Sequence, residues 1–110
     1  MWIFTPGGFV SAVVRPENPS ELAIRARDRE SLEELAEEAG VEIIKTPHGD
    51  YPMRIFVTHE FFADWVARKV FEIDYGNFKS RAHRERPDKY SAALHDVWSA
   101  MLATENEPRS

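Results

Sequence analysis

The sequence predicts a two-layer α+β sandwich, in which an antiparallel sheet of four to five short strands is covered on one face by two to three helices, in a ferredoxin-like or related arrangement. Runs of β-branched and aromatic residues joined by links of hairpin length occupy much of the first half of the chain. Apolar residues at helical spacing dominate the second half. With 110 residues, 43% of them hydrophobic, the chain has room for one core. We expect a single domain over residues 1–104 and a flexible tail over residues 105–110.

The predicted strands are short segments bounded by residues that favour turns. Pro6, Gly7 and Gly8 interrupt the first apolar run, and a Gly-containing loop of hairpin size separates the last two strands. The third strand alternates with a period of two, which places Arg25 and Arg27 together on one solvated face. The predicted strands are the two parts of residues 2–15, residues 22–27, residues 41–45 and residues 51–57.

The predicted helices begin at residues that cap helices. Asp28 caps a helix over residues 28–39, and Thr58 caps a helix over residues 59–73. A last helix follows Pro87, which suits the first turn of a helix. The apolar stripes of these elements and strands predict that the core includes Leu35, Phe56, Phe62, Trp65 and Val97.

All three tryptophans lie in apolar stripes and are therefore expected in the core, whereas an exposed one would mark a partner site. They are Trp2, Trp65 and Trp98. Four glutamates lie opposite the apolar stripe of the first helix, and we interpret them as a solvated face, with an acidic docking face as the alternative. These glutamates are Glu33, Glu34, Glu37 and Glu38.

Composition excludes several kinds of site. The sequence has no cysteine, which excludes disulfides, thiolate metal sites and cysteine nucleophiles. The four histidines lack the spacing of metal ligands, so we expect no metal and no cofactor. Nucleophile-elbow, P-loop and dinucleotide motifs are missing from the sequence. The start of the chain lacks the features of a signal peptide and no run of about 18 apolar residues occurs, so we expect a cytoplasmic protein without a membrane segment.

Charge is unevenly distributed along the chain, although the net charge is −5. Residues 17–42 hold nine acidic and three basic residues, whereas residues 68–89 hold seven basic and four acidic ones. Aromatic and cationic side chains alternate in residues 74–89, a pattern that can bind phosphates and bases or can simply fix a loop. We expect a structural turn at Asp74, Tyr75, Asn77 and Phe78. We expect binding of an anionic partner by Lys79, Arg81, Arg84 and Arg86.

Three motifs stand at the start, in the middle and near the end of the chain. They are Trp2-Ile3-Phe4, Asp74-Tyr75-x-Asn77-Phe78-Lys79 and Val97-Trp98-Ser99. Together they resemble a group of small uncharacterised bacterial and bacteriophage proteins, and the similarity spans residues 1–102. The resemblance implies a shared fold and a phage or mobile-element origin. It implies no chemistry, because the group has no assigned activity.

The leading functional hypothesis is a small non-enzymatic intracellular interaction domain, which either self-associates or binds a bacterial host protein. It follows from segregated charge without a motif for chemistry. The alternative is binding of nucleic acid or a nucleotide by residues 74–89. A small enzyme with an unrecognised carboxylate or histidine site is the third hypothesis. We therefore expect a protein partner or a homo-oligomer, with an anionic ligand as the second kind of partner and no membrane contact.

Overall fold

The structure is a computed structural model that describes residues 1–47, 49–73 and 78–105, with the side chain of Lys79 excepted. Within these ranges the chain forms an α+β sandwich, which confirms the predicted fold class. The elements are β1 (Trp2–Thr5), β2 (Gly8–Val14), β3 (Glu21–Ala26), α1 (Glu30–Ala39), β4 (Ile44–Lys45), β5 (Met53–Thr58), α2 (His59–Phe71), α3 (Phe78–Glu85) and α4 (Lys89–Leu102).

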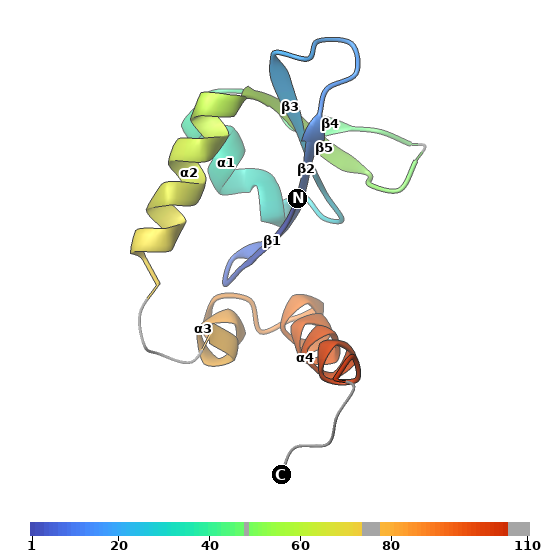
Figure 1. Ribbon diagram of the computed structural model, residues 1–110, viewed down its shortest axis with the longest axis vertical. Helices are drawn as coiled ribbons and strands as arrows, with labels where there is room; N and C mark the ends of the chain where they lie inside the picture. Colours follow the sequence, from blue (N-terminus) through green and yellow to red (C-terminus); the bar gives the residue numbers. More distant parts are fainter. Residues whose placement is uncertain (48, 74–77, 106–110) are drawn as a thin grey trace.

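The five strands form one sheet in the order β1-β2-β3-β5-β4, and every neighbouring pair is antiparallel. Strands β1 and β4 are therefore the two edges. The order of strands and helices along the chain differs from the β-α-β-β-α-β order of ferredoxin-like sandwiches, so the protein has the related form of that architecture. Figure 1 shows α1 and α2 together on one side of the sheet, with α3 and α4 beyond the end of β1.

The main core lies between the sheet and the pair α1 and α2. Ile24, Leu32, Leu35 and Ile55 are completely buried there. The prediction of burial is confirmed for Leu35 and also for Phe62 and Trp65, which are 4% exposed. Alternation along β3 and β5 supplies the sheet side of this core, and the apolar stripes of the two helices supply the other side.

Local capping explains where the first two helices begin and end. The Asp28 carboxylate accepts a hydrogen bond from the Ser31 N–H at 2.9 Å, and the Thr58 hydroxyl accepts one from the Phe61 N–H at 3.1 Å. The predicted cap at Thr58 is confirmed, whereas Asp28 accepts its bond from a position one residue before the N-cap of α1, which Arg29 occupies. Helix α1 ends at Gly40, whose φ of 68° lies in the left-handed region that glycine adopts without steric cost.

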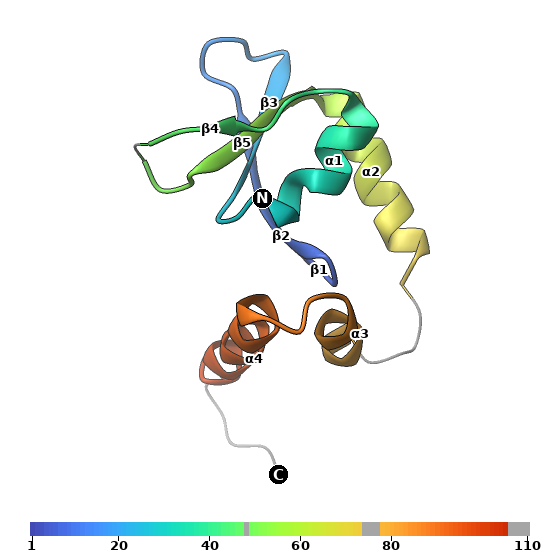
Figure 2. The ribbon, with the colours of Figure 1, turned by 180° about the vertical axis from the view of Figure 1, so that it is seen from behind.

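Helices α3 and α4 pack on each other and on the end of the β1–β2 hairpin rather than on the main core (Figure 2). Ala82, Tyr90 and Leu94 form a second buried cluster with Phe4 and Phe9, which are partly buried. The two phenyl rings stack with their centroids 4.6 Å apart. The described part of the chain thus has two apolar clusters, of which the smaller one holds the C-terminal helices in place.

Four core predictions are wrong. Phe56 lies between Ile55 and Val57 on β5, which both face the helices, so its ring points to the opposite face of the sheet and is half-buried under Arg15. Val97 is 37% exposed because α4 continues past the cluster formed by its first two turns. The remaining two are the tryptophans Trp2 and Trp98, which are 68% and 53% exposed.

Within the described ranges, no helix combines the length and the apolar character that a membrane crossing requires.

Candidate functional site

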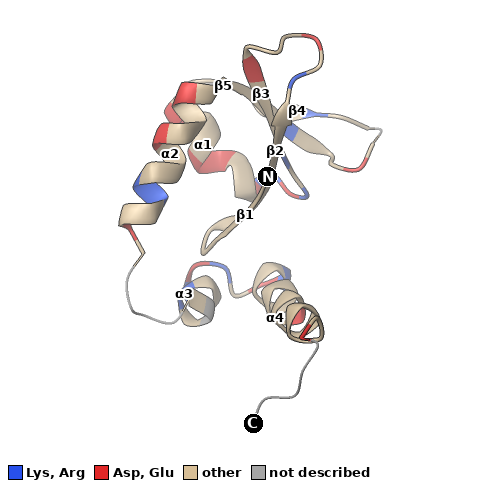
Figure 3. Ribbon diagram, in the orientation of Figure 1, with Lys and Arg blue, Asp and Glu red and all other residues tan. Residues whose placement is uncertain are grey.

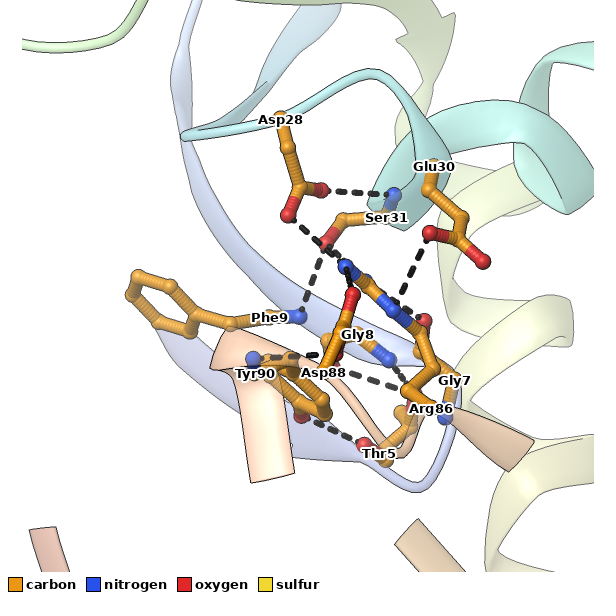
Figure 4. Close-up of polar contacts among 10 residues, drawn as sticks. All are labelled: Thr5, Gly7, Gly8, Phe9, Asp28, Glu30, Ser31, Arg86, Asp88 and Tyr90. Carbon is orange, nitrogen blue, oxygen red and sulfur yellow. Dashed lines mark hydrogen bonds and ion pairs between the residues drawn. The ribbon is translucent and has the colours of Figure 1, made fainter. Parts of the chain in front are cut away.

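The predicted binding residue Arg86 is buried, so its assignment as a solvated ligand for anions is wrong. Its side chain is 5% exposed and its guanidinium forms ion pairs with Asp28 at 3.0 Å, Glu30 at 3.2 Å and Asp88 at 3.1 Å (Figure 4). Three carboxylates from two distant parts of the chain offset the water that the buried cation has lost. Arg86 therefore stabilises the fold and is not available to a partner.

Backbone groups and a tyrosine complete this cluster, which we call the Arg86 clasp. The guanidinium donates to the Gly7 carbonyl and the Ser31 hydroxyl, each at 3.3 Å. The Tyr90 hydroxyl donates to the Thr5 carbonyl at 2.5 Å, as Figure 4 shows. The clasp thereby joins the start of α4 to the β1–β2 turn and to the start of α1.

The clasp alters the acid–base properties of its members. Burial alone would raise the pKa of Asp28, but hydrogen bonds from Ser31 and Arg86 outweigh it and leave the pKa below its ordinary value. The pKa of Asp88 is lowered for the same reason, by hydrogen bonds from Arg86 and the Tyr90 N–H that outweigh desolvation. Burial raises the pKa of the Tyr90 phenol, so the hydroxyl stays protonated and keeps donating its hydrogen bond.

The remaining predicted residues do not gather into one described basic surface. Arg81 is partly buried beside Glu85, with 3.8 Å between the charged atoms, whereas Arg84 is exposed. Phe78 is 39% exposed rather than packed in the core. Three turn residues, Asp74, Tyr75 and Asn77, lie outside the described residues, as does the Lys79 side chain.

A groove of about 680 Å³ runs along the free edge of β1, between that strand and helices α2 and α3. This volume lies within the range of pockets that bind small molecules. Strand β1 with its following turn forms one side of the groove, and the C-terminal half of α2 forms the other. The lining residues are 1–7 together with Glu34, Val66, Lys69, Val70, Glu72, Ile73, Phe78, Arg81 and Glu85.

The backbone of β1 offers to this groove hydrogen-bonding groups that have no partner among the described residues. Met1 and Ala12 exchange two hydrogen bonds, each 2.8 Å long, so they form a hydrogen-bonded pair of the β1–β2 ladder. In an antiparallel ladder such pairs alternate with pairs whose N–H and C=O groups point away from the partner strand. With the register Trp2 to Ser11 and Phe4 to Phe9, the outward groups belong to Trp2 and Phe4.

The walls of the groove are apolar and its charges are matched. Val70 is 55% exposed, Ile73 is 73% exposed, and both line the groove. Lys69 forms ion pairs with Glu34 at 2.7 Å and with Glu72 at 3.4 Å. These pairs leave the groove without a strong field of either sign, which favours an uncharged occupant over an ionic one.

Two features of the sequence pointed to this groove, but periodicity alone could not distinguish them from residues that pack in the core. The apolar stripe of residues 59–73 is longer than the part that the core covers, because burial ends at Trp65 and the residues from Val70 onward are exposed. The second signal was a tryptophan, Trp2, in the first predicted strand of the chain. Both become visible only when the neighbours of each element are known.

In the described part of the chain, no group of three or more histidine, aspartate or glutamate side chains is placed to hold a metal ion. Comparisons with protein-family models, curated proteins and solved structures find no match. The resemblance to bacterial and bacteriophage proteins therefore stays a prediction.

Proposed function

We propose that the protein is a non-enzymatic interaction domain that binds an extended, apolar segment of a partner protein as an added strand along β1. The observation that carries the proposal is the outward-facing backbone of Trp2 and Phe4 at the floor of an apolar groove. Strand addition uses such groups, since main-chain hydrogen bonds supply affinity and side-chain pockets supply specificity. The edge of β1 has no proline and no charged residue to discourage pairing.

The walls of the groove restrict what can pair with this edge. Side chains of an added strand alternate between the two faces of the sheet, so every second one would face Val66, Val70 and Ile73 across the groove. An aliphatic or aromatic residue at these positions would bury apolar surface on both sides. Helix α2 lies across the groove from β1 and leaves too little room for the sheet of a second copy of the domain. A single extended segment therefore suits the groove better.

A single substitution can remove one hydrogen-bond donor from the free edge of β1. Trp2→Pro removes the N–H that faces the groove and leaves the hydrogen bonds to β2 intact, because Trp2 is at a non-hydrogen-bonded position of the ladder. Trp2→Val removes the same ring and keeps the N–H, so it is the matched control. Both variants should melt close to the wild type, since the Trp2 side chain is 68% exposed.

The probe is a set of short random peptides displayed on phage and selected on the wild-type protein. Selected peptides should have apolar residues at alternate positions, and Trp2→Pro should weaken their binding at least about fivefold relative to Trp2→Val. Bound peptide should also slow hydrogen exchange of the Phe4 amide, which faces the groove. Equal binding by both variants, or selection of charged peptides that leave the Phe4 amide unprotected, would contradict strand addition.

A further inference from the structure

Two arginines lie directly opposite each other in the centre of the sheet. The register of β3 and β5 pairs Arg25 with Arg54, so their side chains leave the same face side by side. This face is the one opposite α1 and α2, and we call it the outer face. Arg27 follows Arg25 by two residues and extends the cluster to three cations.

An aromatic ring and a hydroxyl group hold two of these arginines, and no carboxylate in the described part of the chain forms an ion pair with any of the three. The guanidinium carbons of Arg25 and Arg27 lie 4.5 Å and 4.2 Å from the centre of the Tyr51 ring, which is 4% exposed. Arg25 also donates to the Ser11 hydroxyl at 2.9 Å. Within the described ranges, none of the three arginines forms an ion pair with a carboxylate.

Several basic side chains elsewhere in the fold do form ion pairs with acidic side chains. They are Arg15, Arg68, Lys69, Arg81 and Arg86. Like charges directly opposite each other in a sheet destabilise it unless something of opposite sign lies between them. Strand register places Arg25 and Arg54 side by side, and neither has a described carboxylate partner. Such a pair is suited to an anionic ligand, because guanidinium groups bind phosphate oxygens in a two-point geometry.

An exposed aromatic ring lies on the same cross-strand row. Trp2 pairs with Ser11 and Ser11 pairs with Arg25, so Trp2, Ser11, Arg25 and Arg54 form one line across four strands of the outer face. At the usual strand spacing, Trp2 and Arg25 are about 10 Å apart. An exposed indole can stack on a base while the arginines contact phosphate.

The acidic residues of the domain lie mainly elsewhere. Helix α1 has five glutamates and no basic residue, and it covers the opposite face of the sheet, as Figure 3 shows by colour. The outer face can therefore attract a polyanion although the net charge of the chain is −5.

We propose that the outer face binds single-stranded nucleic acid, with phosphates on Arg25, Arg27 and Arg54 and a base stacked on Trp2. A single strand fits better than a duplex because only an unpaired base presents its face to an indole. The site differs from the groove, which uses the backbone edge of β1 rather than this face. It also differs from the predicted basic segment at residues 74–89, whose Arg86 is buried.

Fluorescein-labelled oligo-dT and oligo-U of about 12 nucleotides, with a duplex of the same length, are the probes. Arg25→Gln with Arg54→Gln should weaken binding of the single strands at least about tenfold and reduce the slope of log K against log salt by about 1.4. Arg81→Gln with Arg84→Gln removes the same charge from the predicted segment and should change affinity by less than about twofold. The single Arg54→Gln variant, which loses no described hydrogen bond or ring contact, should weaken binding in the same direction without affecting folding.

Three results would overturn the proposal. They are absence of binding at about 50 mM salt, equal losses in the two double variants, and a preference for the duplex over the single strands. The Arg25→Gln, Arg54→Gln protein should still bind the selected peptides as the wild type does, whichever of these results is obtained. Peptide binding thus tests the groove separately from the nucleic-acid site.

Discussion

Burying an arginine removes water from its guanidinium, and nearby carboxylate or carbonyl oxygens must offset the free-energy cost. Arg86 has both kinds of oxygen close by. Its carboxylate partners are themselves about half exposed, so the clasp is open to acid from solution. The clasp should therefore lose part of its stabilising effect in acid. This follows from the lowered pKa values of Asp28 and Asp88.

The first prediction concerns the pH dependence of stability. A carboxyl group whose pKa is lower in the folded chain stabilises the folded state above its unfolded value, near 3.8 for Asp28, and loses that effect as the pH falls through the folded value. Asp28→Asn should therefore lower the melting temperature at about pH 7 and flatten its decline between about pH 5 and pH 2. Glu33→Gln, at an exposed position of α1, is the control and should reproduce the wild-type slope. Parallel curves for Asp28→Asn and the wild type would contradict this role.

The second prediction concerns the packing of Trp65. Its ring stacks on Phe62 with centroids 5.8 Å apart, and its indole N–H donates to Glu34 at 3.2 Å. Trp65→Ala should reduce the free energy of unfolding by about 3 to 5 kcal/mol, measured by urea denaturation. Trp98→Ala removes the same side chain from a position that is 53% exposed and should cost less than about 1 kcal/mol. Similar costs for the two variants would mean that Trp65 does not support the core.

The close approach of β2 and α1 depends on Gly8. A Cβ atom at this position would lie 2.4 Å from the Ser31 hydroxyl oxygen and 2.7 Å from the Ser31 Cα. The strand can thus begin directly against the first turn of α1, where the Phe9 N–H donates to the Ser31 hydroxyl at 3.3 Å.

The third prediction is that Gly8→Ala forces β2 and α1 apart and lowers the free energy of unfolding by about 1 to 3 kcal/mol, as overpacking does. Gly7→Ala is the matched control, because its Cβ would meet no atom closer than 3.8 Å. Chemical denaturation of both variants compares them directly. A larger loss for Gly7→Ala would show that the turn, and not the contact with Ser31, limits substitution here.

Local sequence pattern predicted the positions of helices α1 and α2. It did not predict which faces of the helices other parts of the chain cover. Periodicity and caps located α1 and α2 to within a few residues, because these signals are local. The same periodicity placed Val97 and Trp98 in the core, since an apolar stripe looks alike whether or not another element covers it. Burial of Arg86 depends on Asp28 and Glu30, which are more than fifty residues away in sequence. No spacing rule connects such partners.

The molecule is elongated, with extents of 49 × 27 × 25 Å, and its described residues form two apolar clusters of unequal size. The larger cluster joins the sheet to α1 and α2. The smaller one, with the Arg86 clasp and the hydrogen bond from Tyr90 to Thr5, attaches α3 and α4. Regions with fewer buried apolar contacts open at a lower free energy than the rest of a protein.

The fourth prediction is that α3 and α4 open as a unit before the sheet does. Native-state hydrogen exchange should be slowest at amides of β3 such as Ile24 and faster at Leu94 of α4, because opening α4 exposes only the smaller cluster. Arg86→Gln loses charge-assisted hydrogen bonds of the clasp, so exchange at Leu94 should accelerate about tenfold or more while exchange at Ile24 changes less. Tyr90→Phe, which loses only the bond to Thr5, should have a smaller effect in the same direction. Equal acceleration at both amides would mean that the two clusters unfold together and that the clasp supports the whole domain.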